Sequence, residues 1–239
     1  MKSLFRVVRK GMKLLFVALF VLILGFGGYY GVKGYRMYLS AVRETPIEEM
    51  VTDIRNREHF TEYEDLPSIY KDAVISVEDK RFETHCGIDF IAICRAAWTD
   101  VKAGSFVEGG STITQQIIKN QYFTQEKKME RKAAEVFAAV ELEHLYSKKE
   151  IFELYVNSIY FGGGYYGIYD AAQGYYGKSP SELSDEEAVM LAGLPNAPAI
   201  YSLNHKEAAD RRMKTVLSRM VRCGVIDQER ADDMMKKEH

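Results

Sequence analysis

The sequence predicts a mainly α-helical protein in which one N-terminal transmembrane helix precedes a helical domain. Residues 14–32 form an uncharged, mostly apolar run of nineteen. In most later segments apolar residues recur every three or four positions, and no segment alternates convincingly as a strand would. The 239 residues and their 47% apolar share suffice for one compact domain with an anchor.

The N-terminal charges predict the orientation of this anchor. Residues 1–13 contain five cations and no acid, which is typical of a cytoplasmic tail. At about 1.5 Å per residue, the run 14–32 nearly matches the roughly 30 Å hydrocarbon layer. A cleaved secretory signal is the alternative, although this run is longer than a usual signal core. With the anchor retained, the rest of the chain is expected on the outer face of the cytoplasmic membrane, and in either case it is exported.

The composition argues against several classes of site. Without the five cations of the tail, 27 lysines and arginines face 34 acids, a formal charge of −7, so nucleic acid is not an expected partner. Cys86, Cys94 and Cys223 form no CxxC pair, which argues against a zinc site or a disulfide framework. A single bridge is the alternative to the buried or half-buried thiols that we expect.

The helices follow from apolar spacing, caps and breaks. We expect a charged juxtamembrane stalk over 33–64, with a helix signal at 47–55, and an extracytoplasmic domain over 65–239. Within that domain, helices are predicted at 68–77 and 88–101, from 131 onward, after the capping boxes of Ser147 with Glu150 and Ser184 with Glu187, at 206–222, and after Asp227.

The apolar stripe of 88–101 predicts a helix that packs into the core. Contact with the bilayer is the alternative, with Trp98 and Phe106 at the interface.

The segment 77–87 carries the first chemical signal. A pair of adjacent acids, an aromatic residue and a histidine follow an apolar helix there, and the charged groups are costly to place near a core. Glu78 is the candidate general base, because its apolar neighbour and a nearby positive loop could tune its proton affinity. Asp79 could orient a neighbour. For His85 we favour a structural hydrogen bond.

A glycine-rich loop at 107–112 leads into a helix and forms the second signal. Ser111 or Thr112 can cap that helix, and Thr112, Gln116 and Lys119 share one face with Gln115 beside them. Donors and a positive charge near a helix N-terminus suit an anionic or sugar-like ligand. An ordinary capped helix with a solvated polar face is the alternative.

Two later positions are more ambiguous. Glu135 lies one residue off the apolar stripe of its helix and could face a cleft, although a surface salt bridge with Arg131 explains the i, i+4 pair equally well. Asn157 also lies off its stripe and could simply hydrogen-bond the next loop.

Taken together, these segments resemble the family 51 peptidoglycan glycosyltransferases, over roughly residues 65–225. The resemblance rests on EDKRFETHCG at 78–87, GGSTITQQIIKN at 109–120, RKAAE at 131–135, KKEIFELYVNSIYFG at 148–162 and the segment 176–201, in this order. It implies a lysozyme-like helical domain that polymerises lipid II into β-1,4-linked glycan strands. Because no transpeptidase segment follows, we expect a monofunctional form.

The resemblance also implies a role for each motif residue. Glu78 would deprotonate the acceptor hydroxyl, Glu135 would be the second essential acid, and cations would hold the departing diphosphate. Those cations are Lys119, Lys127, Arg131 and Lys132, with Lys127 standing where some relatives carry arginine. Substrate contacts are expected from Asp79, Phe82, His85, Ser111, Thr112, Gln115, Gln116 and Asn157.

The expected partners are lipid II, the growing glycan strand and the cytoplasmic membrane, with transpeptidases or division proteins as further candidates. The sequence demands no metal, since it has no DxD motif or histidine cluster, but a magnesium or manganese contact with the diphosphate stays open. A lysozyme-like muramidase is one alternative, although it needs no cationic cradle. A catalytically inactive scaffold is the other, and it predicts a broken Glu78, Lys119 or Glu135, whereas all three are present.

Overall fold

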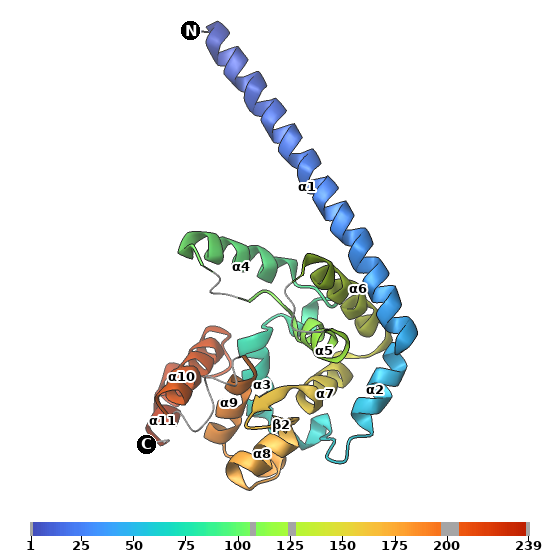
Figure 1. Cartoon of the computed structure of the whole chain (residues 1–239). Helices are drawn as coiled ribbons and strands as arrows, with labels where there is room; N and C mark the ends of the chain where they lie inside the picture. The colour runs from blue at the N-terminus through green and yellow to red at the C-terminus, as the bar shows by residue number, and fades with distance from the viewer. Residues whose placement is uncertain (1, 106–108, 124–127, 197–205, 238–239) are drawn as a thin grey trace.

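A long N-terminal helix rises from a helical domain in the computed structural model, which describes residues 2–105, 109–123, 128–196 and 206–237 (Figure 1). This helix, α1 (Lys2–Glu44), leaves the domain beside α6 (Met129–Leu145) and extends away from it. Among the described residues it is the one helix long and apolar enough to cross a membrane. The predicted transmembrane run 14–32 lies in its exposed part.

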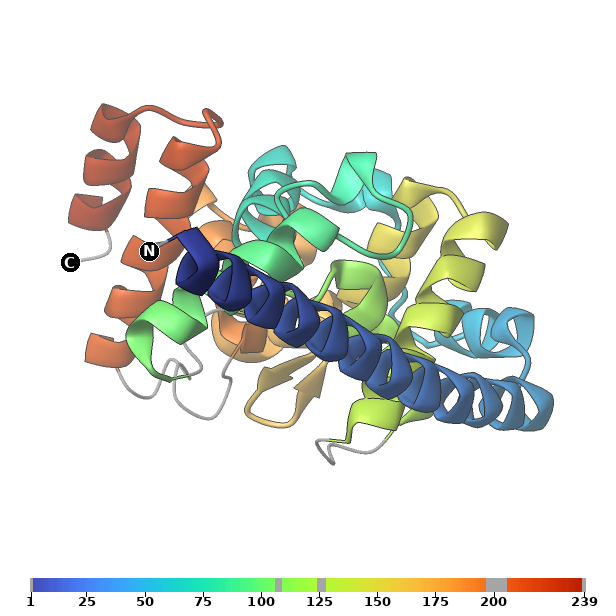
Figure 2. The same ribbon diagram turned by 90° about the horizontal axis from the view of Figure 1, so that it is seen from above.

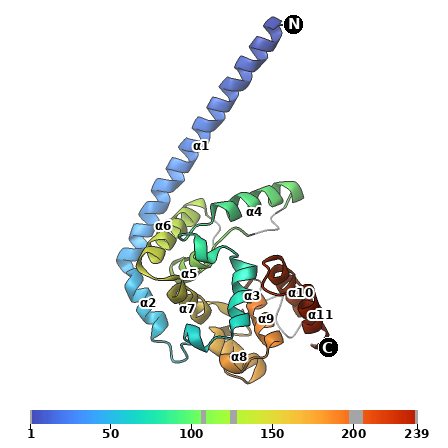
Figure 3. The same cartoon turned by 180° about the vertical axis from the view of Figure 1, so that it is seen from behind.

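The last turns of α1 pack on α6, as Figures 1 and 3 show from opposite sides. Tyr38 donates a hydrogen bond of 2.6 Å to the Glu141 carboxylate, and the ring of Phe137 meets Tyr35 edge-on at 5.2 Å. The two backbones can approach closely because α1 carries Gly34 at the crossing. The anchor and α6 therefore form one packed unit.

We expect Gly34→Ala to loosen this crossing. A Cβ placed on Gly34 would lie 2.9 Å from the carbonyl carbon of Ala133, so the helices must separate. Overpacking of this kind costs about 1–3 kcal/mol, which is roughly 2–12 °C in Tm for a domain of this size. Gly31→Ala is the matched control, because nothing lies within 4 Å of its added Cβ. Thermal unfolding of both variants in detergent, followed by circular dichroism, checks this expectation; an equal Tm would contradict it.

The segment 33–64 differs from the stalk that the sequence suggests. Its helix α2 (Ile47–Arg55) packs into the hydrophobic core through four side chains on one face: Ile47, Met50, Val51 and Ile54. Their spacing makes an apolar stripe along a short helix, and the domain covers that stripe. The packed domain therefore begins at least as early as Ile47 rather than at residue 65.

The core is built from short helices that pack around α3 and α7. The remaining elements are, in order, η1 (Tyr63–Asp65), α3 (Ser68–Glu78), η2 (Phe82–Thr84), α4 (Phe90–Ala103), α5 (Ile113–Tyr122), α7 (Lys148–Ser158), β1 (Tyr160–Gly162), β2 (Tyr165–Tyr166), α8 (Ile168–Tyr176), η3 (Pro180–Glu182), α9 (Asp185–Gly193), η4 (Leu194–Asn196), α10 (Lys206–Arg222) and α11 (Gln228–Lys237). Helix α3 packs against α9 and α10, and α5 packs against α6 and α7. Seen from above, α10 and α11 lie side by side at one end of the domain (Figure 2).

A two-stranded hairpin and the helix α8 that follows it are elements that the sequence did not indicate. Strand β1 pairs antiparallel with β2, with Tyr160 opposite Tyr166. Gly163 and Gly164 turn the chain between them at φ values of 61° and 91°, which only glycine adopts easily. Strands of two or three residues are too short to show period-two alternation.

Helix α4 contradicts the expectation of core packing. It begins after Asp89, whose carboxylate caps the Ala92 amide at 2.9 Å, and among its residues only Ala96 is buried. One face of the helix presents exposed apolar side chains instead: Phe90, Ile91, Trp98 and Val101. Phe106, the other interfacial candidate, lies outside the described residues. An apolar stripe predicts a covered face but cannot say whether protein or lipid covers it.

The three cysteines are free thiols, so no disulfide joins them. All three are exposed, which differs from the buried or half-buried positions that we expected.

Candidate functional site

Glu78 is the last residue of α3, and its side chain is only 6% exposed. Gln116 of α5 donates its amide to one carboxylate oxygen at 3.0 Å, and Arg212 of α10 donates to the other at 3.2 Å. Donors from two other helices thus hold the carboxylate at the point where α3 ends.

Asp79, which follows Glu78, and His85 form a hydrogen-bonded frame at the end of α3. The Ile113 amide, at the N-terminus of α5, donates to Asp79 at 3.0 Å, and His85 Nε2 lies 2.8 Å from the same carboxylate oxygen. The Gly87 amide donates to His85 Nδ1, which leaves the proton on Nε2. Asp79 therefore ties the start of α5 to the end of α3, and the structural reading of His85 agrees with its contacts.

Gly87 lets this frame approach α6. Its φ is 86°, and an added Cβ would lie 2.8 Å from the Ala139 backbone. Thr112 caps α5 by accepting from the Gln115 amide at 3.1 Å, and its hydroxyl donates to the Gly87 carbonyl at 2.8 Å. Gln115 completes a capping box with Thr112. Both side chains are buried, so they orient α5 rather than face solvent.

A cationic group lies on α5 and α6. Lys132 donates to Ser111 at 2.8 Å and to Glu135 at 2.9 Å, while Arg131 Nε lies 3.4 Å from the other oxygen of Glu135. Glu135 itself is 1% exposed. The salt bridge predicted for Arg131 and Glu135 is therefore present, but its acid is buried rather than on the surface.

Lys119 lies within electrostatic range of both acids. Burial lowers the pKa of its ammonium below the ordinary lysine value, and the nearby charges of Lys132 and Arg131 lower the pKa further, while Glu135 and Glu78 oppose them. A lysine in such a place gains most from a ligand that brings negative charge. The site thus combines a held carboxylate with three cations that a single buried acid only partly balances.

Two further predicted contact residues, Phe82 and Asn157, also have structural positions. Phe82 is 1% exposed and packs in the core with Phe152, so its ring is not available to a substrate. Asn157 is buried on α7 and exchanges two hydrogen bonds of 2.8 Å with the Thr61 backbone, and it also donates to the Glu153 carbonyl at 2.9 Å. Asn157 therefore holds the loop at Thr61, 96 residues earlier in the chain, and not the next loop that the sequence suggested.

Lys127 lies outside the described residues. Among the residues that the structure describes, no group of three or more His, Cys, Asp or Glu side chains could hold a metal ion.

Arg212 is the site residue that sequence reasoning missed. It bridges Glu78 and the Gly193 carbonyl, at 3.2 and 2.8 Å, across 134 and 19 residues of sequence. A signal was present, because Arg212 lies on the buried stripe of α10 next to Met213 and one turn before Val216. A charged residue on an apolar stripe usually has a buried partner.

The transglycosylase family profile matches residues 43–221. Penicillin-binding protein 1A of Aquifex aeolicus is 46% identical over 173 residues, 72% of this chain and 24% of that protein. Penicillin-binding protein 1A of Vibrio cholerae is 38% identical over 251 aligned residues, 95% of this chain and 30% of that protein. A crystal structure of penicillin-binding protein 1A from Haemophilus influenzae covers 52% of this chain and 15% of its own, at 31% identity and a TM-score of 0.36.

The chain spans less than a third of the length of these relatives. The profile nevertheless covers most of this chain, including α3, α5, α6 and Arg212. The mainly α, lysozyme-like architecture expected from the sequence is the architecture of that family. On this match, the chain belongs to the transglycosylase family.

Proposed function

We propose that this protein is a peptidoglycan glycosyltransferase that polymerises lipid II into β-1,4-linked glycan strands. The observation that carries the proposal is the pairing of one held carboxylate, Glu78, with a separate cationic group, Lys119, Arg131 and Lys132, in a chain of this family. A glycosyl transfer from a diphosphate needs both: a base for the acceptor and positive charge for the leaving group.

In this mechanism Glu78 accepts the proton of the acceptor sugar's 4-hydroxyl. A carboxylate has about four acceptor positions, so two remain when Gln116 and Arg212 occupy the others. The oxygen then attacks C1 of the donor sugar, and the bond from C1 to the diphosphate oxygen breaks with inversion. The electron pair leaves with undecaprenyl diphosphate, whose charge the ammonium and guanidinium groups stabilise.

Glu135 acts through its neighbours. It contacts Arg131 and Lys132 together and is itself enclosed, so it fixes the positions of both cations. We assign it as a positioning residue for the diphosphate site.

Polymerisation of fluorescent lipid II by the purified full-length protein in detergent tests the proposal. Glycan strands that resolve on a gel and disappear on lysozyme treatment are the expected product. The assay is run without added metal, with Mg²⁺ and with Mn²⁺. A folded protein that yields no strands under all three conditions would refute the proposed activity.

The membrane position is part of the proposal. Helix α4 lies on the side of the domain from which α1 leaves, and its exposed apolar face has no cover among the described residues (Figure 1). We infer that this face rests in the interface of the outer leaflet, where a lipid-linked substrate enters.

Trp98 reports on this inference directly, because it is the single tryptophan of the chain. In nanodiscs, lipids brominated on their acyl chains should quench its emission strongly, whereas the water-soluble quencher acrylamide should act weakly. Acrylamide quenching of the same protein in a membrane-free, denatured sample serves as the reference. Strong acrylamide quenching in nanodiscs, without bromine quenching, would place α4 in water instead.

Lys119→Arg should change the pH dependence of turnover. Because the pKa of the Lys119 ammonium is lowered, its charge is present at low pH and is lost on raising the pH earlier than for an ordinary lysine. Arginine stays protonated. The alkaline fall in kcat/KM should therefore move to higher pH in Lys119→Arg, while Lys132→Arg leaves it in place. If the alkaline fall in kcat/KM stayed at the same pH in an active Lys119→Arg protein, the charge of Lys119 would not contribute to diphosphate binding.

A further inference from the structure

A positively charged pocket of about 290 Å³ is lined by other residues than the cationic group of Lys119, Arg131 and Lys132. Its walls come from α3, α4 and α10. The described residues that line it are Ser76, Lys80, Arg95, Arg219, Arg222 and Cys223. Four of these six carry a positive charge and none carries a negative charge. We call this the α3–α4–α10 pocket.

Its charge contrasts with the rest of the exported chain, in which acids outnumber bases. Arg219 and Arg222 lie in the last turns of α10, where a cation also interacts well with the helix dipole. That explanation does not extend to Arg95, which projects from the middle of α4, or to Lys80, which follows the end of α3. An anion bound among these side chains would interact with cations from three elements at once.

The lining indicates the class of anion. Arginine forks bind phosphate oxygens in pairs, and three arginines are available together with a lysine and the Ser76 hydroxyl. No aromatic side chain is among the described lining residues, so a sugar or nucleobase would find no ring to stack on. A compact, multiply charged phosphate group fits this composition best.

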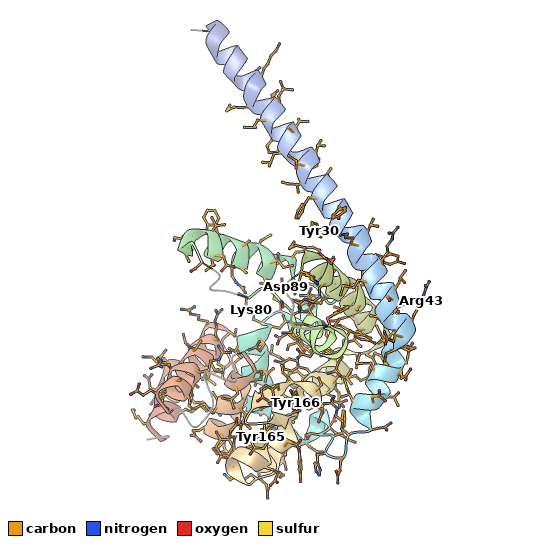
Figure 4. The ribbon with its side chains drawn as sticks, in the orientation of Figure 1. Tyr30, Arg43, Lys80, Asp89, Tyr165 and Tyr166 are labelled. Atoms are coloured by element: carbon orange, nitrogen blue, oxygen red, sulfur yellow. The ribbon has the colours of Figure 1, made fainter. Side chains whose placement is uncertain are left out.

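The location indicates where that group comes from. Arg95 is part of α4, whose exposed apolar face we place at the membrane. In Figure 4, Lys80 lies between α4 and the end of α10 that is nearest to α4. Lys80 also follows Glu78 by two residues, so the pocket lies close to the proposed general base. A phosphate group there would belong to a molecule whose tail stays in the bilayer.

We propose that the α3–α4–α10 pocket binds the phosphate or diphosphate group of a membrane lipid, separately from the site of Lys119, Arg131 and Lys132. Two lipids offer this chemistry: an anionic phospholipid, and the polyprenyl diphosphate end of the acceptor substrate. The second source rests on the proposed function, whereas the first does not.

Binding of inorganic diphosphate to the full-length protein in a neutral detergent is the first test, measured by isothermal titration calorimetry. Wild type should bind at two sites. The double variant Arg219→Gln/Arg222→Gln should lose one of them, with an affinity loss of about tenfold or more, and Lys119→Ala should weaken the other. The matched control is Arg211→Gln/Lys214→Gln, which removes the same charge from exposed positions of the same helix and should keep both sites.

Correct folding is checked by the circular dichroism melting curve. If the double variant is unstable, Arg222→Gln alone replaces it, because that side chain is exposed. A folded pocket variant whose titration equals that of wild type and control would overturn the proposal.

The lipid source is tested in nanodiscs, with Trp98 emission as the reporter, since Trp98 follows Arg95 by three residues on α4. Discs of phosphatidylcholine alone are compared with discs that also contain phosphatidylglycerol or undecaprenyl diphosphate. A response to phosphatidylglycerol that the pocket variant lacks identifies a phospholipid, and a response confined to undecaprenyl diphosphate identifies the substrate. No response to either lipid in wild type would overturn the proposal. None of these readouts requires turnover, so an absence of polymerisation would count against the proposed function alone.

Discussion

Glu78→Gln is expected to reduce lipid II polymerisation by about 10²–10⁴-fold while the protein stays folded. The substitution keeps the size of the side chain and its contact with Gln116, but an amide cannot accept the proton of the acceptor hydroxyl. Substrate binding should change much less than turnover, because the cations that hold the diphosphate are untouched. Initial rates of strand formation, measured over a range of lipid II concentrations, give kcat and KM separately.

Glu83→Gln is the matched control for this variant. Glu83 is an exposed acid five residues further along the same segment, and its substitution removes the same charge without reaching the site. It should keep nearly full activity. If Glu78→Gln proved as active as Glu83→Gln in a folded protein, the base would have to be another group.

Glu135→Gln is expected to lower kcat/KM by roughly 10²-fold and also to destabilise the domain. Its carboxylate is buried between Arg131 and Lys132, and its removal leaves two cations close together without their counter-charge. Loss of a buried charged hydrogen-bond partner costs about 1–3 kcal/mol. Kinetics with lipid II and the Tm of the same preparation measure both effects.

Two further variants separate the electrostatic role of Glu135 from simple packing. Glu135→Asp keeps the charge and should recover part of the activity that Glu135→Gln loses. If Glu135 only filled space, the shorter side chain of Asp would recover no activity. Glu130→Gln removes an acid from the first turn of the same helix and should have little effect on turnover. Equal losses in Glu130→Gln and Glu135→Gln would assign the effect to the net charge of α6.

The helical elements were largely predictable because their signals are local. The capping boxes of Ser147 with Glu150 and Ser184 with Glu187 begin α7 and α9 as expected. The helix at 47–55 is present over the expected residues. Caps and breaks act over one turn, so they can be read without knowledge of the fold.

What covers each helix was not predictable in the same way. The stripe of α2 and the stripe of α4 look alike in sequence, yet one is buried in the core and the other is exposed. The difference depends on which helices lie next to them, and that is a property of the whole chain.

The site shows the same division. The sequence pointed to Glu78, Lys119 and Glu135, and the structure brings the elements that carry them together. The sequence could not show that Asn157 bonds the Thr61 loop or that Arg212 contacts Glu78, because these partners are 96 and 134 residues apart. Hydrogen-bond partners across such separations follow from packing rather than from spacing.

The crossing of α1 with α6 has a consequence for the geometry of the reaction. One continuous helix leads from the predicted membrane span to the helix that bears Arg131 and Glu135. The elevation of these groups above the bilayer is therefore set by the register of α1, at about 1.5 Å per residue. Under the proposed function, the protein would accept only diphosphates held at that elevation, and a residue inserted between the span and Gly34 would both lift the domain and turn it by about 100°.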